Sequence, residues 1–400
     1  SGGCRLPLSD DPSSSSIFKQ TGSRATRNQS KRGALPSFHA RQQSKLHTQS
    51  VLLAVTAGQA ASKMAAAHYA KAAFAPDASN VHYVEGKFRN DRGKSMFYCA
   101  LFPVDESKPL RGVVLFLHGI GEHSHRFTHV YEYLCAHNYG VIAYDLAAHG
   151  RSECEREGVR GHSERFQDFV DDTNRFVGIA KKQIFPQMLP KTKQSADMIP
   201  LIFMGISFGT LVGLHTVLSG KHKFSAVVLA SPAVSVEYTV VLRVMSLFSK
   251  SLSWLTPTAK IVPGVNFEGL SRDPAFLEDY LGDPLNVTDN LSARMGEQSL
   301  TAMGLLENDR RCEQPNSAFC ALPLLIVQGT ADKVTSIPMA KAFFARIANK
   351  DKQFKEFDGL FHCIFNEPEK LQVLDHITQW LDTRVPTASG YRVEQIQSKL

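Results

Sequence analysis

The sequence predicts an α/β protein with a doubly wound, mostly parallel sheet that carries an inserted helical cap. Strand-length apolar runs without polar alternation suit strands buried on both faces of a parallel sheet. An amphipathic stretch at 166–177 has helical periodicity and lies between two such runs. Strand and helix in alternation are typical of a doubly wound sheet. The apolar runs lie at 112–119, 140–145, 200–205, 224–230 and 322–329.

One long segment interrupts this alternation. Residues 233–318 are too numerous for a simple crossover and carry a helical pattern of their own, so we expect them to form the cap. The main domain is then expected at 77–232 and 319–383, with a frayed tail at 384–400. The polar, proline-bearing stretch 183–197 is expected to be a surface loop.

Residues 1–76 differ in composition from the rest of the chain. They hold ten of the 45 Lys and Arg but two of the 38 Asp and Glu, a net of +8, which leaves 35 basic and 36 acidic residues, a net of −1, on the other 324. The formal charge of +7 therefore gives no reason to expect a nucleic-acid partner. Three interpretations stay open for this segment: a transit peptide, leader sequence upstream of a start at Met64, and a disordered tail.

Cysteine usage and hydropathy bear on location. The seven cysteines form no Cys-x-x-Cys pair, and their odd number favours reduced thiols in a reducing compartment. No apolar run approaches the roughly 18 residues of a membrane-spanning helix. We expect a cytoplasmic or peripheral membrane protein, imported into an organelle if residues 1–63 are a transit peptide.

A glycine-flanked serine is the strongest local motif. The pentapeptide Gly-Ile-Ser-Phe-Gly at 205–209 follows the apolar run 200–204 and precedes a helical pattern at 210–218. This is the strand, turn and helix of a nucleophile elbow, in which glycines relieve collisions around a strained nucleophile. Ser207 is the predicted nucleophile.

A serine hydroxyl needs a base, and four histidines follow the elbow. His215 and His222 are too close in the chain to fold back, and His376 lies in a helical pattern where we expect a surface position. His362 follows a strand and a glycine, so that a loop can carry it over the sheet. It is the predicted general base.

Three aspartates compete to orient this base. Asp332 follows the buried run 324–328 in a loop at the carboxyl end of the sheet, where such sites assemble. Asp358 is expected to cap a turn, and Asp145 precedes the serine, against the order serine, acid, histidine. Asp332 is the predicted acid.

An acyl-transfer site also needs two backbone donors for its oxyanion. One is expected at Phe208, directly after the nucleophile, and the other at Ile120, in a glycine-containing loop after an early strand. His118, in the same loop, is expected to brace it rather than to act in catalysis.

A histidine cluster suggests a rival chemistry. His123, His125 and His129 begin like the His-x-His run of binuclear zinc hydrolases, but Phe127 and Thr128 replace the expected aspartate. No metal and no other cofactor is expected, and metal-dependent hydrolysis is kept as an alternative.

Six motifs in order resemble the monoacylglycerol lipase and lysophospholipase family of α/β hydrolases, over roughly residues 81–382. They lie at 118–124, 145–152, 205–209, 280–285, 328–332 and 359–362. The resemblance implies the α/β-hydrolase fold and hydrolysis of a lipid ester, most of all monoacylglycerol, through an acyl-enzyme. It places the family's triad on Ser207, Asp332 and His362, its oxyanion donors on Ile120 and Phe208, and its glycerol-binding side chains on Glu122, Arg126 and Tyr280.

The chain departs from this family at three positions. Ile206 and Phe365 stand where family members carry histidines near the alcohol, and Ala148 stands where they carry glycine. A lysophospholipase and a general long-chain carboxylesterase therefore stay open, as does a non-catalytic binding protein of the same fold. The expected partners are a lipid ester and, through the cap, a membrane surface; no nucleic acid and no metal is expected.

Overall fold

The computed structural model describes residues 76, 81–105, 108, 110–189, 199–236 and 249–385. The predictions for the leader and for most of the tail fall outside these residues. Of the tail, Arg384 pairs with Asp351 and Val385 is buried. Within the described part of the chain, no helix is both long and apolar enough to cross a membrane.

One sheet dominates the described residues, with eight strands in the order β1-β2-β4-β3-β5-β6-β9-β10. β1 and β2 form an antiparallel hairpin, β2 pairs antiparallel with β4, and the remaining neighbours are parallel. The strands are β1 (Val81–Arg89), β2 (Ser95–Pro103), β3 (Gly112–Leu117), β4 (Tyr139–Tyr144), β5 (Leu201–Ile206), β6 (Ala226–Ala230), β9 (Leu324–Gly329) and β10 (Lys352–Phe357).

Helices cover both faces of this sheet. Side chains of α2 (Thr128–Ala136) and α10 (Lys370–Asp382) pack into one core cluster. Those of α3 (Phe166–Ile179), α4 (Phe185–Met188), α5 (Phe208–Leu218) and α9 (Ile337–Arg346) pack into the cluster on the opposite face. The predicted α/β architecture, a mostly parallel sheet between helices, is therefore confirmed.

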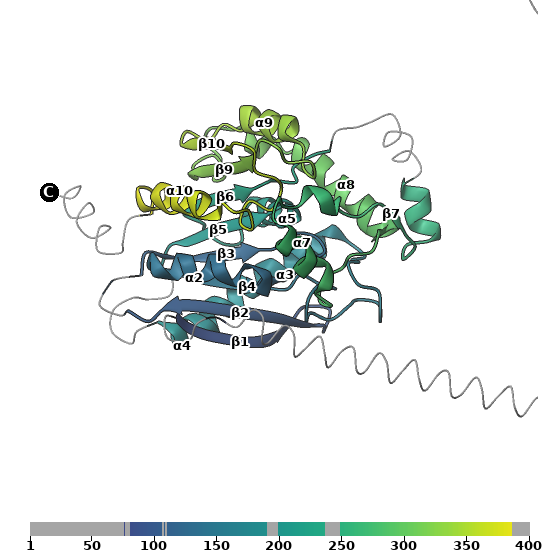
Figure 1. Ribbon diagram of the computed structural model, residues 1–400, viewed down its shortest axis with the longest axis horizontal. Coiled ribbons are helices and arrows are strands. Elements are labelled where there is room, and N and C mark those ends of the chain that lie inside the picture. Colours follow the sequence, from purple (N-terminus) through teal and green to yellow (C-terminus); the bar gives the residue numbers. More distant parts are fainter. Residues whose placement is uncertain are drawn as a thin grey trace, which may run out of the picture. The chain divides into compact units, whose positions relative to one another are not determined.

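The segment between β6 and β9 contains further elements. Among its described residues are a helical stretch at 249–255, the ribbon of β7 (Lys260–Val262) and β8 (Leu291–Ser292), α7 (Pro274–Gly282) and α8 (Ala293–Glu307), and the short helices η4 (Phe267–Gly269) and η5 (Arg310–Cys312). Figure 1 shows β7 and α8 to one side of the main sheet. His215 of α5 lies 3.0 Å from the Ala302 carbonyl oxygen of α8, and the Phe166 amide donates to Gln298. The boundaries 233 and 318 stay a prediction.

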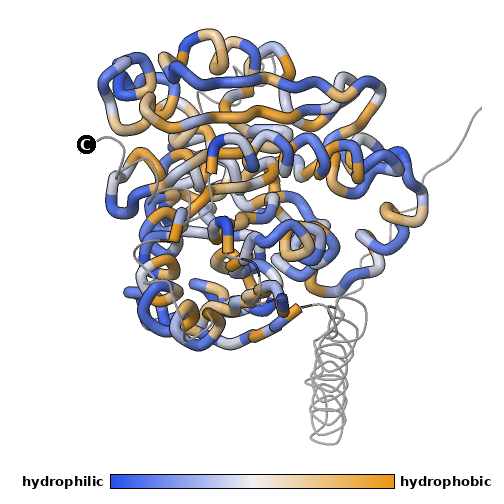
Figure 2. The backbone as a smooth tube through the Cα atoms, turned by 90° about the vertical axis from the view of Figure 1, so that its left-hand side faces the viewer, coloured by the Kyte–Doolittle hydropathy of each residue, from blue (hydrophilic) through white to orange (hydrophobic). Residues whose placement is uncertain are grey.

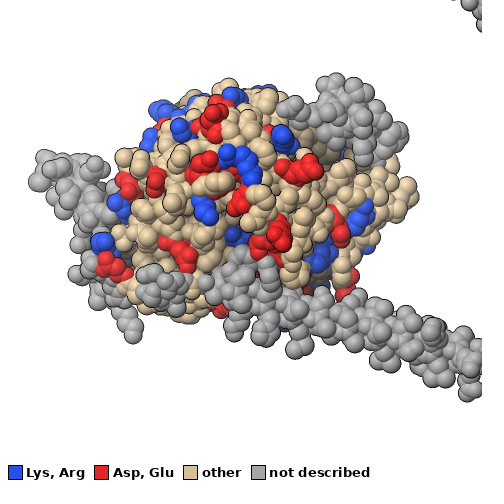
Figure 3. Space-filling model, viewed as in Figure 1, with Lys and Arg blue, Asp and Glu red and all other residues tan. Residues whose placement is uncertain are grey.

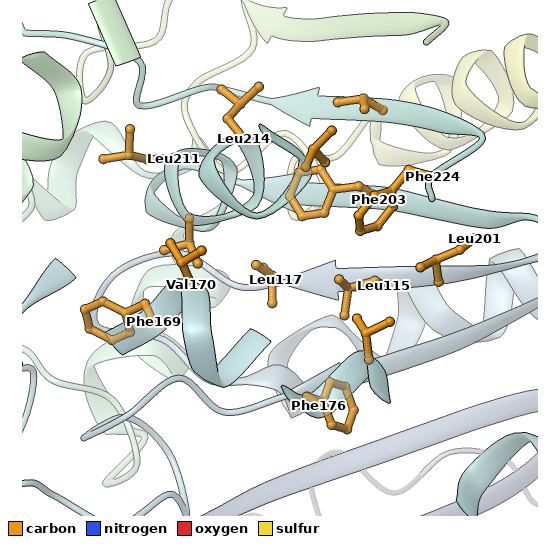
Figure 4. Close-up of a cluster of buried hydrophobic side chains, with 14 of the residues drawn as sticks. Leu115, Leu117, Phe169, Val170, Phe176, Leu201, Phe203, Leu211, Leu214 and Phe224 are labelled. Atoms are coloured by element: carbon orange, nitrogen blue, oxygen red, sulfur yellow. The ribbon is translucent and has the colours of Figure 1, made fainter. Parts of the chain in front are cut away.

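The interior follows the two-residue period of the strands. Leu115 and Leu117 of β3 point into one core cluster and Phe116 into the other. Figure 4 shows the first cluster, in which side chains of β3 and β5 meet Phe169 and Phe176 of α3 and leucines of α5. Figure 2 shows hydrophobic chain in the interior and hydrophilic chain outside. Because both faces are covered, the central strands β3, β4, β5, β6 and β9 are apolar without alternation, which is how the sequence revealed them, whereas β1 and β10 at the edges carry polar side chains.

One local prediction is wrong. The surface loop expected at 183–197 begins in helical structure, because η2 (Ala180–Ile184) and α4 continue α3 with a single π turn. Ile184 and Phe185 are buried in the core, and this tertiary burial outweighs the polar neighbours. Residues 190–198 lie outside the described part of the chain.

Surface charge agrees with the near-neutral composition of residues 77–400. On the face shown in Figure 3, acidic and basic side chains of the described residues are interspersed.

Candidate active site

Ser207 occupies a sharp turn between β5 and α5. Its φ of 53° and ψ of −125° are unusual for a residue with a side chain. A Cβ on Gly209 would lie 2.3 Å from the Leu117 carbonyl oxygen, so that only glycine fits there. The turn thus has the strained geometry of a nucleophile elbow, with Ser207 directly before the first turn of α5.

A buried histidine and aspartate pair lies in the loops after β9 and β10. His362 Nδ1 is 3.0 Å from Asp332 Oδ2 and 3.2 Å from Oδ1. Burial alone would raise the pKa of Asp332, but His362, the Thr335 hydroxyl and the Val334 amide together lower it to about 2. An ionised Asp332 accepts a hydrogen bond from Nδ1–H of His362, so the lone pair of the neutral ring lies on Nε2.

The ends of neighbouring strands bring these groups to one edge of the sheet. The Ser207 amide donates to Ala230 at the end of β6 (3.0 Å), and the next residue, Ser231, donates its hydroxyl to the His362 carbonyl oxygen (2.7 Å). The Thr335 hydroxyl, which donates to Asp332 (2.7 Å), also lies 3.3 Å from the Ser231 carbonyl oxygen. The structure therefore brings the three predicted triad residues into adjoining loops.

The competing residues have partners elsewhere. His215 and His222 contact the carbonyl oxygens of α8 and α3, and His376 contacts Gln353 on β10. Asp358 accepts a hydrogen bond from the Thr330 hydroxyl in the loop after β9 (3.0 Å), and the turn cap expected of it stays a prediction. Asp145 accepts from Ser124 and from the Arg151 amide, and so fixes two loops to each other.

The loop after β3 contains the predicted oxyanion donor Ile120. His118 accepts a hydrogen bond from the Leu146 amide on Nε2 (2.9 Å) and therefore donates from Nδ1 to the Gly119 carbonyl oxygen (2.7 Å). Burial lowers the pKa of His118 to about 4, so its ring is neutral and acts as a brace for the loop. A Cβ on Gly119 would lie 2.7 Å from Glu122 Oε2 and 3.3 Å from Ser207 Cβ, so the loop and the carboxylate lie beside the serine.

The three side chains implied for alcohol binding lie together. Arg126, in η1 (Ser124–Phe127), has its guanidinium 5.1 Å from the centre of the Tyr280 ring on α7. It pairs with Asp279 (3.0 Å) and Asp283 (3.1 Å). Burial raises the pKa of Glu122, against the lowering effect of Arg126.

Comparison with known proteins identifies the family. The model of the family described as serine aminopeptidase, S33, matches residues 108–369. The chain belongs to this family. The hydrolase is 31% identical over 271 residues to a monoacylglycerol lipase of Mycolicibacterium smegmatis, covering 68% of this chain and 88% of that protein. It is 27% identical to a phospholipase of Bacillus subtilis, over 65% of this chain and 91% of the relative.

A solved structure agrees with the fold. The crystal structure of the Paleococcus ferrophilus monoacylglycerol lipase matches with a TM-score of 0.56 at 25% identity, covering 76% of this chain and 99% of that one. The predicted class is therefore confirmed: the chain is a serine hydrolase with the α/β-hydrolase fold, related to monoacylglycerol lipases.

The histidines of the rival metal hypothesis have separate partners in this hydrolase. His123 Nε2 is 2.8 Å from Asp283, His125 Nε2 is 2.8 Å from the Tyr83 hydroxyl, and His129 Nε2 is 2.7 Å from a backbone carbonyl oxygen. Burial lowers the pKa of His125 and of His129 to about 4. Within the described residues, no three His, Cys, Asp or Glu side chains are grouped as a metal would require.

Sequence reasoning missed two supports of the acid in this hydrolase. Thr335 donates to Asp332 from both its hydroxyl and its amide, and Gln328 Nε2 lies 3.2 Å from Asp332 Oδ2. The spacing Asp-x-x-Thr is a local signal for such a turn. Gln328 points inward from β9, and no local pattern distinguishes it from other buried positions.

The departures from the family have structural consequences in this hydrolase. Ala148 has a φ of 61°, a conformation that favours glycine. Phe365 is fully buried and lies near Phe116 in the core. Ile206 is likewise fully buried, at the end of β5.

Proposed function

We propose that this hydrolase cleaves carboxylic esters of lipids, with monoacylglycerol as preferred substrate, through an acyl-enzyme on Ser207. The observation that carries the proposal is the buried pair of Asp332 and His362, in loops that adjoin the turn where Ser207 has nucleophile-elbow geometry. Relatives named as monoacylglycerol lipase and phospholipase support the lipid substrate.

In the first half-reaction, Ser207 Oγ attacks the ester carbonyl carbon while His362 Nε2 takes the hydroxyl proton. Asp332 stabilises the imidazolium through Nδ1. The amides of Ile120 and Phe208 stabilise the negative oxygen of the tetrahedral intermediate. When the intermediate collapses, the bond to the alcohol breaks and His362 returns its proton to the leaving oxygen.

In the second half-reaction, water replaces the alcohol. His362 takes a proton from the water, whose oxygen attacks the acyl carbon, and then returns that proton to Ser207 as the acyl bond breaks. The products are a carboxylic acid, which loses its proton to the solvent, and the free enzyme, and no group beyond the chain and water takes part.

The charges at the alcohol end favour an uncharged leaving group. Glu122 Oε1 is buried and accepts no hydrogen bond from the described residues, so it is suited to accept one from a substrate hydroxyl. Arg126 already shares its charge between Asp279 and Asp283. A phosphate would meet the Glu122 carboxylate and a guanidinium whose charge is already paired, which disfavours lysophospholipids relative to monoacylglycerol.

The helical stretch at 249–255 is the proposed membrane contact. Leu252, Trp254 and Leu255 are exposed, with 76% of Trp254 and 66% of Leu255 accessible. Large exposed apolar side chains in the segment inserted between β6 and β9 are suited to insertion into a lipid surface. The enzyme would then work on the membrane while remaining peripheral to it.

The central experiment compares Ser207→Ala with Ser219→Ala, a serine at the far end of α5. Monooleoylglycerol, lysophosphatidylcholine and a p-nitrophenyl ester are the substrates, and a fluorophosphonate probe reports an activated serine. We expect Ser207→Ala to lose both turnover and labelling while Ser219→Ala keeps both.

Each rival function predicts a different result. Turnover retained by folded Ser207→Ala would sink the proposal. A wild-type chain that binds lipid without turnover or labelling would be a non-catalytic binding protein, and activity removed by EDTA and restored by zinc would indicate the metal route. A higher kcat/KM on lysophosphatidylcholine would make the chain a lysophospholipase, and a preference for simple long-chain esters would make it a general carboxylesterase.

A further inference from the structure

Asp283 is a buried carboxylate that none of the predicted roles uses. It ends α7, and its side chain is fully inaccessible. Asp283 Oδ1 accepts from the Leu285 amide (2.9 Å), and Oδ2 lies 2.8 Å from His123 Nε2 and 3.1 Å from Arg126 Nη1. The carboxylate therefore joins a turn of the β6–β9 segment to the residues that directly follow the loop of Ile120.

The same turn rests on that loop through its backbone. The Val287 amide donates to the Gly121 carbonyl oxygen at 2.8 Å. Gly121 has a φ of 80°, and a Cβ on it would lie 2.8 Å from the Val287 carbonyl oxygen and 3.3 Å from the Tyr280 hydroxyl. The residue next to Ile120 is thus held against the turn that begins at Asp283.

We propose that Asp283 is a positioning residue for the oxyanion hole. By holding His123 and Arg126 to the turn at 283–287, it fixes the chain directly after Ile120, while the His118 brace fixes the chain directly before it. The inference rests on the proposed function, since it assigns the Ile120 amide to the oxyanion. An oxyanion donor acts only in the transition state, so its displacement lowers kcat more than it changes substrate affinity.

Arg126 offers a matched control. The second carboxylate partner of Arg126 is Asp279, one turn earlier on α7. Asp279 Oδ2 lies 3.0 Å from Arg126 Nη1, close to the 3.1 Å of Asp283, but the Asp279 side chain is 38% exposed. Asp279→Asn therefore removes one carboxylate from the same guanidinium and leaves the contacts of Asp283 in place. Asp283→Asn keeps the size of the side chain. Its amide oxygen can still accept from Leu285, but its NH2 group then faces Arg126, which can only donate.

The experiment measures kcat, KM and two inhibition constants for the full chain. An alkyl trifluoromethyl ketone forms a tetrahedral adduct that needs the oxyanion hole, whereas a 1-O-alkylglycerol ether occupies the pocket without reacting. For Asp283→Asn we expect kcat to fall roughly tenfold to a hundredfold and the Ki of the ketone to rise by a similar factor. The KM and the Ki of the ether should change by less than about threefold, as should all four constants for Asp279→Asn.

Three results would overturn the proposal: an unchanged kcat in Asp283→Asn, an equal loss in Asp279→Asn, or equal weakening of both inhibitors. If Asp283→Asn does not fold, Gly121→Ala tests the second contact between this turn and the loop of Ile120, because its methyl group presses on the Val287 carbonyl oxygen, and the same split between the two inhibitors is expected. Absence of wild-type turnover and of Ser207 labelling would instead refute the proposed function, so the two failures are distinguishable.

Discussion

Replacing Asp332 by asparagine should cost this hydrolase about three to four orders of magnitude in kcat while leaving the fold intact. The contacts of the carboxylate set the direction of this effect. Oδ1 accepts from the amides of Val334 and Thr335 (2.8 and 3.0 Å), so the oxygen of an asparagine must occupy that place. Its NH2 group then occupies the position of Oδ2, 3.0 Å from His362 Nδ1.

That NH2 group can only donate, so it selects the tautomer of His362 whose proton is on Nε2. This tautomer cannot take the proton of Ser207. A loss of three to four orders of magnitude corresponds to about 4–5.5 kcal/mol in the barrier. KM should change little, because the carboxylate does not touch the proposed substrate position.

The assay is stopped-flow hydrolysis of a p-nitrophenyl ester, with a thermal melt to establish that the variant is folded. Thr335→Val is the control, because it removes the 2.7 Å hydroxyl donor to Oδ2 but keeps the carboxylate and the tautomer. We expect it to lose less than about tenfold. A folded Asp332→Asn with kcat within about tenfold of the wild type would refute the reasoning.

Three further predictions follow from burial and geometry. Gly209→Ala should lose activity and about 3 kcal/mol of stability, because its Cβ would lie 2.3 Å from a carbonyl oxygen. Its control, Gly178→Ala, places the methyl group in open space on α3 and should gain about 0.5–1 kcal/mol of stability. Equal urea midpoints for the two variants would contradict this. Burial holds the pKa values of four histidines below their values in the unfolded chain, so below about pH 6.5 the unfolded chain binds more protons than the folded one. The free energy of unfolding should therefore fall by about 5 kcal/mol between about pH 7 and pH 5.5. A urea midpoint that stays constant over that range would argue against it. These histidines are His118, His125 and His129, with pKa values of about 4, and His149, at about 3. On vesicles of brominated phosphatidylcholine, the fluorescence of the exposed Trp254 should be quenched, while that of the buried Trp380 should not. Trp254→Phe should therefore show no quenching. If the wild type shows none either, the proposed membrane contact is removed.

Features that depend on neighbours in the chain could be predicted from the sequence. The central strands, which are covered on both faces, are apolar throughout, and the elbow at Ser207 requires glycine two residues to either side. The choice among histidines used chain distance, because a residue within the helix that follows the nucleophile cannot fold back over it. The loop expected at 183–197 was wrong at its start, since the burial of Ile184 and Phe185 depends on partners distant in the sequence.

The sequence by itself determined the fold class, the elbow and the three residues proposed as the triad, because each leaves a local pattern of spacing and polarity. Tertiary structure alone decided how those residues are supported. The Ser231 hydroxyl donates to the His362 carbonyl oxygen across 131 residues of chain, and Asp283 meets His123 across 160 residues. Such contacts form only when distant segments pack together. In the sequence, an aspartate that joins a buried network has no local pattern that distinguishes it from an aspartate on the surface.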